Sequence, residues 1–233
     1  MSSLLDLISR LAGLSGVPMV IGLLVTASVI AIVRDWRFAL WALLVQYILL
    51  GVLHLRMLSP ELALIKVLVG VLICPMLYWS ARWVESERAH KAEVERRQVA
   101  SEKGEVPLPP LPWPIRSTNW IFRLLVVFLL GMVLYSVLSA FPVGDLDAQP
   151  FIAADIAPAC VWLGLIGLLT LVLTSEPLTG GMGLLTLVSG FELFFDVMSP
   201  GLAGVGMFAA IELTMGLAIS HMITVGGLTG KVL

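Results

Sequence analysis

Seven apolar segments, each close to the length that crosses a lipid bilayer, follow one another along the chain. A helix that crosses the hydrocarbon core of a bilayer needs about 20 predominantly apolar residues. The segments that meet this requirement are 17–33, 38–55, 61–81, 119–140, 155–174, 182–199 and 202–223. The pattern predicts an all-α, polytopic membrane protein with about seven transmembrane helices. Ahead of them, residues 3–14 predict either a short interfacial helix or a frayed first turn of the first span.

The composition supports the membrane class and gives no sign of a redox or metal centre. Hydrophobic residues make up 59% of the 233 positions, charged residues only 13%, and the mean hydropathy is +1.01. A soluble domain of this size does not need so much apolar surface. Cys74 and Cys160 both fall within apolar segments without a CxxC motif, which is typical of core residues. With no haem-attachment motif and no dinucleotide-binding loop, we expect no cofactor in this chain, and no nucleic-acid partner.

The distribution of Lys and Arg predicts the orientation of the chain in its membrane. One side collects Arg34, Arg37, Arg82, Arg88, Lys91, Arg96, Arg97, Lys103, Arg116, Arg123 and Lys231. The other side has only Arg10 and Arg56, a ratio of 11 to 2. Because basic residues gather on the cytoplasmic side, we expect the N-terminus outside and the C-terminus in the cytoplasm.

One long polar stretch divides the chain. The parts are the first three spans (1–81), a cytoplasmic charged helix with a Pro-rich linker (82–117), the fourth span (118–141) and the last three spans (155–223). Glu87 and Lys91, four positions apart, favour a solvated helix that continues the third span. The sequence VPLPPLPWP (106–114) instead predicts an extended polyproline strip. The strip is either a docking site for a cytoplasmic partner or a stiff tether to the fourth span.

Two registers of internal similarity suggest a parallel repeat of three helices. A shift of 146 residues aligns Lys66 with Glu212 and Gln46 with Glu192, so each half has a polar residue in its second helix and another in its third. A shift of 140 residues aligns Ser-Pro at 59–60 with Ser-Pro at 199–200. With a single extra span between them, spans 1–3 and 5–7 would cross the membrane in the same direction. Chance similarity between apolar helices is the alternative.

The candidate functional residues are polar side chains inside apolar spans. Glu192 and Glu212 lie within the sixth and seventh spans, and Lys66, Asp196 and Gln46 lie within the third, sixth and second. A charged side chain at membrane depth costs several kcal/mol unless it is paired or loses its charge, about 2.5–3.5 kcal/mol on insertion scales. A buried carboxyl beside a lysine can gain or lose a proton, which is the physical requirement for a proton relay.

Helical spacing places small residues beside these charges. Glu212, Gly216 and Ser220 share one face of the seventh span, and Lys66 and Gly70 share one face of the third. A charge followed by small residues lets a neighbouring helix come close and cover the charge. The column that Ser189 and Asp196 form with Glu192 leads toward the outer surface.

Each of these residues also has a purely structural interpretation. Lys66 is about six residues into its helix, roughly 9 Å at 1.5 Å per residue, and its side chain could reach the outer surface. Asp196 could cap the outer end of the polar column, and Gln46 could serve as a helix–helix hydrogen bond. We expect His54 to lie at a membrane face rather than to take part in transfer. The glycines in 180–183 predict a flexible break before the sixth span.

Two short motifs carry a resemblance to a known family. They are Gly-Phe-Glu-Leu at 190–193 and the segment 209–218, which reads Ala-Ala-x-Glu-x-x-x-Gly-Leu-Ala. Residues 155–223 resemble the three-helix subunit K (chain 4L) of respiratory complex I and the C subunit of Mrp-type sodium/proton antiporters. Over its full length the chain resembles hydrogenase-4 component E, although the loop 82–117 is unusually large for that family.

The resemblance implies a role in an energy-converting membrane complex. In that family the two glutamates that match Glu192 and Glu212 belong to the membrane proton path. The expected partners are large antiporter-like membrane subunits, with peripheral redox subunits acting indirectly, in a bacterial or archaeal cytoplasmic membrane. Two alternatives remain open: a component of a sodium/proton antiporter without a redox partner, and a structural scaffold whose carboxyls only fix helix packing.

Overall fold

Seven helices and no strand make up the part of the chain that the structure describes. The structure is a computed structural model that describes residues 16–33, 35–55, 60–103, 118–140, 150–174, 176–199 and 201–229. The helices are α2 (Gly16–Ile32), α3 (Trp36–His54), α4 (Pro60–Lys103), α5 (Thr118–Ala140), α6 (Pro150–Leu173), α7 (Pro177–Met198) and α8 (Leu202–Thr229). Six of them contain stretches long and apolar enough to cross a membrane, and the apolar part of α2 is shorter. The all-α, multi-pass membrane class is therefore confirmed.

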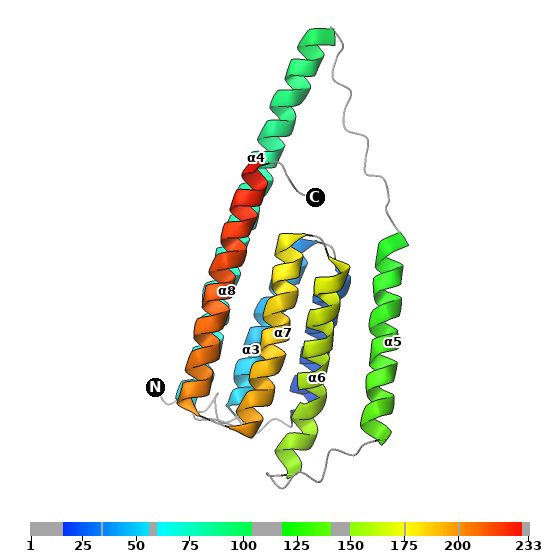
Figure 1. The fold of residues 1–233 in the computed structure, drawn as a ribbon, viewed down its shortest axis with the longest axis vertical. Helices are drawn as coiled ribbons and strands as arrows, with labels where there is room; N and C mark the ends of the chain where they lie inside the picture. Colours follow the sequence, from blue (N-terminus) through cyan, green and yellow to red (C-terminus); the bar gives the residue numbers. More distant parts are fainter. Residues whose placement is uncertain are drawn as a thin grey trace.

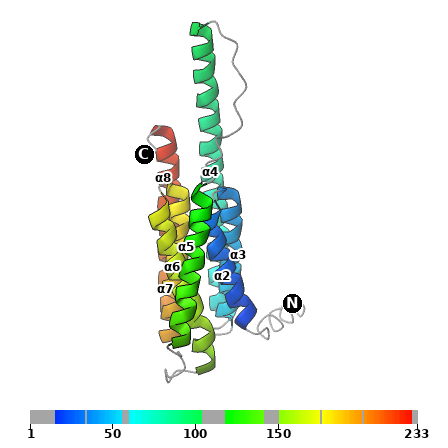
Figure 2. The same cartoon turned by 90° about the vertical axis from the view of Figure 1, so that its right-hand side faces the viewer.

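Helix α4 extends far beyond the rest of the bundle (Figures 1 and 2). It runs unbroken from Pro60 to Lys103 through the apolar third span and the charged stretch after it. The prediction of a charged helix that continues the third span is confirmed. The Pro-rich segment 106–114 and the N-terminal segment 3–14 lie outside the described residues.

The glycines before the sixth span do not form the expected break. Helix α7 begins at Pro177, a residue suited to the first helical turn because its missing N–H has no partner there in any case. The helix continues through the glycines, where Gly181 faces the side chain of Ile219 and Gly183 faces Thr170. The prediction of a flexible break was wrong because these glycines let α6 and α8 approach α7 closely.

Six of the seven described helices form two sets of three that pack against each other. Each set packs in chain order, α2–α3–α4 and α6–α7–α8, and the sets meet through α2 with α6, α3 with α7 and α4 with α8. Helices α4 and α8 run side by side in the same direction (Figure 1). This is the arrangement expected of a parallel pair of three-helix sets. An internal duplication stays a prediction.

Helix α5 lies at the edge of the bundle, against α2 and α6 (Figure 1). Its Arg123 donates hydrogen bonds to the carbonyl of Ala31 (3.2 Å), at the end of α2, and to the carbonyl of Leu173 (3.0 Å), at the end of α6. A cation at a helix C-terminus is favourable because it faces unpaired carbonyls and the negative end of the helix dipole. A single guanidinium therefore ties α5 to two neighbours.

Close packing between α3 and α4 sets the position of the polar groups described below. Gly51 of α3 faces the side chain of Val67, and Gly70 of α4 faces the side chain of Tyr47, with no room at either glycine for a Cβ atom. Between α3, α4, α7 and α8 the core also contains buried apolar residues, among them Ile73, Leu77 and Met182. The polar groups therefore lie in a well-packed interior.

Candidate functional site

Lys66 lies at the centre of a buried cluster of charges contributed by α4, α7 and α8. Its side chain is 1% exposed, and its ammonium donates to Oε2 of Glu192 on α7 and to Oε1 of Glu212 on α8, the latter at 2.6 Å. Both carboxylates are also almost completely buried. We call Lys66, Glu192 and Glu212 the Lys–Glu–Glu triad.

Helix positions explain why the three side chains meet. Lys66 lies six residues from the start of α4 and Glu212 ten residues from the start of α8, about 9 Å and 15 Å along the axes at 1.5 Å per residue. Because α4 and α8 are parallel neighbours, the long lysine side chain reaches toward the membrane interior to meet Glu212. The alternative in which Lys66 reaches the outer surface was wrong, because two anions inside offer a partner that lipid cannot.

Neighbouring side chains complete the surroundings of the triad. Ser189, one turn before Glu192 on α7, donates to Oε1 of Glu212 at 3.1 Å. The ammonium of Lys66 also lies 5.0 Å from the ring centroid of Tyr47, a distance suited to a cation–π contact. The other oxygens of the two carboxyls, Glu192 Oε1 and Glu212 Oε2, have no hydrogen-bond partner among the described residues.

The charges of the triad do not balance unless it also holds a proton. One ammonium and two carboxylates leave an excess negative charge, and an uncompensated buried charge is strongly unfavourable. A single added proton neutralises the cluster, and either carboxyl has a free oxygen to take it. The geometry therefore offers two alternative positions for one proton on either side of Lys66.

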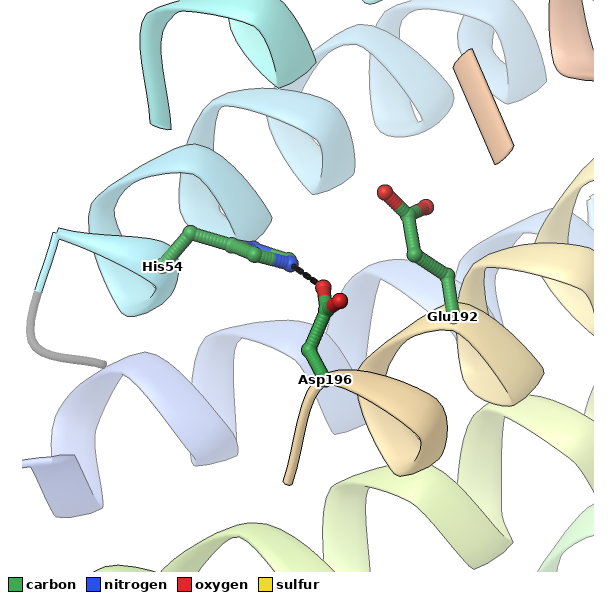
Figure 3. Close-up of side chains that lie close together, drawn as sticks. All are labelled: His54, Glu192 and Asp196. Atoms are coloured by element: carbon green, nitrogen blue, oxygen red, sulfur yellow. Dashed lines mark hydrogen bonds and ion pairs between the residues drawn. The ribbon is translucent and has the colours of Figure 1, made fainter. Parts of the chain in front are cut away.

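A second buried pair joins α3 to α7. The ring of His54 contacts the carbonyl of Leu50 through Nδ1 (2.7 Å) and Oδ2 of Asp196 through Nε2 (2.7 Å), as Figure 3 shows for the Asp196 contact. A carbonyl only accepts, so Nδ1 carries a hydrogen. One further proton then lies between Nε2 and Oδ2. The pair is either imidazolium with carboxylate or neutral imidazole with carboxylic acid.

Glu192 lies between the triad and this pair. Ligand-capable atoms of His54, Glu192 and Asp196 all lie within 4.8 Å of one another (Figure 3). One nitrogen and two carboxylate oxygens at such distances are also a donor set that a divalent cation can use. Here, however, the Lys66 ammonium already binds Glu192, and both ring nitrogens of His54 are engaged. The arrangement suits protons better than a metal ion.

Sequence reasoning located most of these residues but not all of their contacts. Glu192, Glu212 and Lys66 meet, and the face of α8 that carries Glu212 and Ser220 lies against α4, where Ser220 hydrogen-bonds Ser80. Asp196, a candidate for proton transfer or for a cap of the polar column, is the buried partner of His54.

His54 and Gln46 differ from their expected roles. His54 is the last residue of α3, at one end of the bundle, but its side chain is only 1% exposed because it packs against Asp196 of α7. It stands eight residues after Gln46 on the same stripe of α3, which was the signal for its burial. The amide of Gln46 is also buried, but within the described residues it makes none of the expected helix–helix hydrogen bonds.

Comparison with known proteins identifies no relative of this chain. No family model matches the chain, and neither the curated proteins nor the solved structures contain a match to it. The function must therefore be argued from the side chains themselves.

Proposed function

We propose that the chain is a non-catalytic, multi-pass subunit of a complex I-like or hydrogenase-4-like energy-converting membrane complex. In this role it conducts protons through the membrane arm by means of Glu192, Lys66 and Glu212. The observation that carries the proposal is the position of one ammonium between two buried carboxyls. The motifs around Glu192 and Glu212, which resemble those of complex I subunit K, support it from the sequence.

The triad supplies the properties that a relay needs. A proton on Glu192 leaves Lys66 paired with ionised Glu212, and a proton on Glu212 leaves Lys66 paired with ionised Glu192. The two states have the same net charge, so moving the proton between them does not change the cost of burying charge. The hydrogen bond from Ser189 to Glu212 and the contact of the Tyr47 ring with the Lys66 ammonium help to hold these groups in place.

The proposal also includes a setting for the chain. The ratio of basic residues favours an N-terminus outside and a C-terminus in the cytoplasm. The resemblance implies the cytoplasmic membrane of a bacterium or archaeon. Large antiporter-like subunits would contact the chain within the membrane, and peripheral redox subunits would act on it indirectly. The redox chemistry and its cofactors would belong to those other chains.

The test is proton translocation by the native complex in membrane vesicles. The variants Glu212→Gln and Glu192→Gln each remove one of the two positions for the proton. We therefore expect each variant to lose coupled proton uptake while the complex still assembles. Glu61→Gln is the matched control, because Glu61 is an exposed carboxyl at the start of the same helix as Lys66. Co-purification of the partner subunits monitors assembly.

The outcomes separate the alternatives. Unaltered proton uptake in both variants would refute the relay. Loss of the assembled complex in both would favour a structural scaffold. Transport that requires sodium and needs no electron donor would favour a sodium/proton antiporter component.

A further inference from the structure

We infer that the His54–Asp196 pair is the site through which the Lys–Glu–Glu triad exchanges protons with one membrane face, the face at which α3 and α7 end. This inference rests on the proposed function, since it assigns an entrance to the same relay. It adds His54 and Asp196 to the relay, and of these two only Asp196 was a candidate for proton transfer from the sequence.

The hydrogen bonds of the pair make it a proton carrier. His54 Nδ1 is held by the carbonyl of Leu50, and a single proton lies between Nε2 and Asp196 Oδ2. Moving this proton from the ring to the carboxyl leaves the pair neutral overall in both states. Because both ring nitrogens are engaged, a proton enters or leaves the pair through Asp196 Oδ1, which has no partner among the described residues.

Glu192 connects the pair to the triad. The ligand atoms of His54, Asp196 and Glu192 lie within 4.8 Å of one another, a gap that one water can bridge with two hydrogen bonds of about 2.8 Å each. Asp196 Oδ1 and Glu192 Oε1 are buried and have no partner in the described part of the chain, so both can accept such bonds. Figure 3 shows the two carboxyls on the same side of α7.

The ionisable groups that face the pair come from three helices. Glu192 precedes Asp196 by one turn on α7, and Lys66 on α4 is bound to Glu192. The thiol of Cys160 on α6 is within range of an electrostatic interaction with Asp196. Of these groups, only Glu192 offers a free oxygen next to His54, so a proton that leaves the pair toward the interior goes to Glu192.

Depth along the helices shows which face the pair serves. His54 is the last residue of α3, and Asp196 lies two residues before the end of α7, about 3 Å at 1.5 Å per residue. Glu192 lies about 9 Å from the end of α7, and Lys66 lies about 9 Å from the start of α4, on the same side of the bundle. The titratable groups thus form a series from one end of the bundle to the triad.

In the opposite direction no acidic or basic side chain is buried among the described residues, and the buried polar groups there are the amide of Gln46 and hydroxyls such as that of Thr186. Ile73, Leu77 and Met182 are fully buried, and Gly216 and Gly181 are closed by Ile73 and Ile219. The side-chain hydrogen bond between α4 and α8 in that direction, Ser80 with Ser220, begins eight residues beyond Glu212 on α8, about 12 Å away. Neither serine is ionisable, so this contact makes a poor proton donor to the triad.

Infrared spectroscopy of the full chain in lipid nanodiscs tests the inference. The wild type should show the C=O stretch of a buried protonated carboxyl that both Glu192→Gln and Glu212→Gln remove, because each variant leaves Lys66 with one carboxylate. After transfer to D₂O the band shifts as the proton exchanges. We expect His54→Gln and Asp196→Asn to slow this exchange about 100-fold, at the low end of what general acid–base groups contribute.

Two comparisons make the result decisive. Ser80→Ala, on the side of the triad away from the His54–Asp196 pair, should leave the exchange rate unchanged. Exchange at the wild-type rate in both His54→Gln and Asp196→Asn, or slowing by Ser80→Ala alone, would overturn the inference and leave the triad standing. Absence of a band that responds to Glu192→Gln and Glu212→Gln would instead count against the proposed function itself. Circular dichroism checks that each variant is folded.

Discussion

Removing the charge of Lys66 tests the charge count on which the proposed function rests. The lysine holds two carboxylates, and all three side chains are at most 1% exposed. In Lys66→Met both carboxyls lose their cation, and breaking a buried pair by removing one partner costs about 3–5 kcal/mol. At about 2–4 °C per kcal/mol for a chain of this size, the unfolding temperature should fall by about 6–20 °C.

The opposite change provides the matched comparison. Glu192→Gln and Glu212→Gln each leave one ammonium with one carboxylate, which is a neutral cluster, so we expect unfolding temperatures close to that of the wild type. The triple variant Lys66→Met, Glu192→Gln, Glu212→Gln contains no charge in the triad and should recover most of the loss. Stability should therefore follow the net charge of the cluster rather than the number of ion pairs removed.

The chain carries its own reporters for this measurement. Cys74 and Cys160 are both free and buried. A thiol-reactive dye therefore becomes fluorescent as heating exposes them in mild detergent. If Lys66→Met unfolds at the wild-type temperature, the charge count is wrong. It is also wrong if each Glu→Gln variant loses as much stability as Lys66→Met. In either case the two carboxyls of the triad do not share one proton.

Three further changes test packing around the site, each read by the same thermal unfolding. Gly70→Ala should destabilise the protein by about 1–3 kcal/mol because the new Cβ would overlap the side chain of Tyr47. Gly206→Ala is the control, because the space around Gly206 is open. Equal effects of the two changes would contradict the close approach of α3 and α4. Arg123→Gln should cost about 1–2 kcal/mol by uncapping α2 and α6, while Arg37→Gln, which breaks an exposed pair with Glu85, should change little; the reverse order would refute the capping role. Gln46→Leu should stabilise by about 1–3 kcal/mol by removing a buried amide without a partner among the described residues, and a loss of stability would show that the amide has a partner.

Hydropathy and spacing predicted the helices and the charged residues that meet, because both depend on properties local to each helix. Apolar runs of bilayer length mark the spans, and an ionisable residue inside one must find a partner. The 146-residue shift aligns Lys66 with Glu212 as equivalent positions, and the structure shows that these two side chains also contact each other. The function of these residues stays a proposal, since pairing alone does not move protons.

Contacts between helices were harder to predict. The burial of His54 depends on how α7 crosses the end of α3, and hydropathy gives depth but not which neighbour covers a side chain. The start of α7 was misjudged because glycines weaken isolated helices but also permit close packing, and only the positions of Thr170 and Ile219 decide between the two. Arg123 could not be placed from sequence because its partners are backbone carbonyls on two other helices.

The ion pair between positions 66 and 212 bears on why both three-helix sets belong to one polypeptide. These positions coincide when the chain is shifted by 146 residues, and they also touch. In a symmetric dimer of identical three-helix proteins the same contact would join two copies of one residue, and two lysines or two glutamates would repel. A single polypeptide is free of that constraint. One position can hold a cation and the other an anion, as positions 66 and 212 do here.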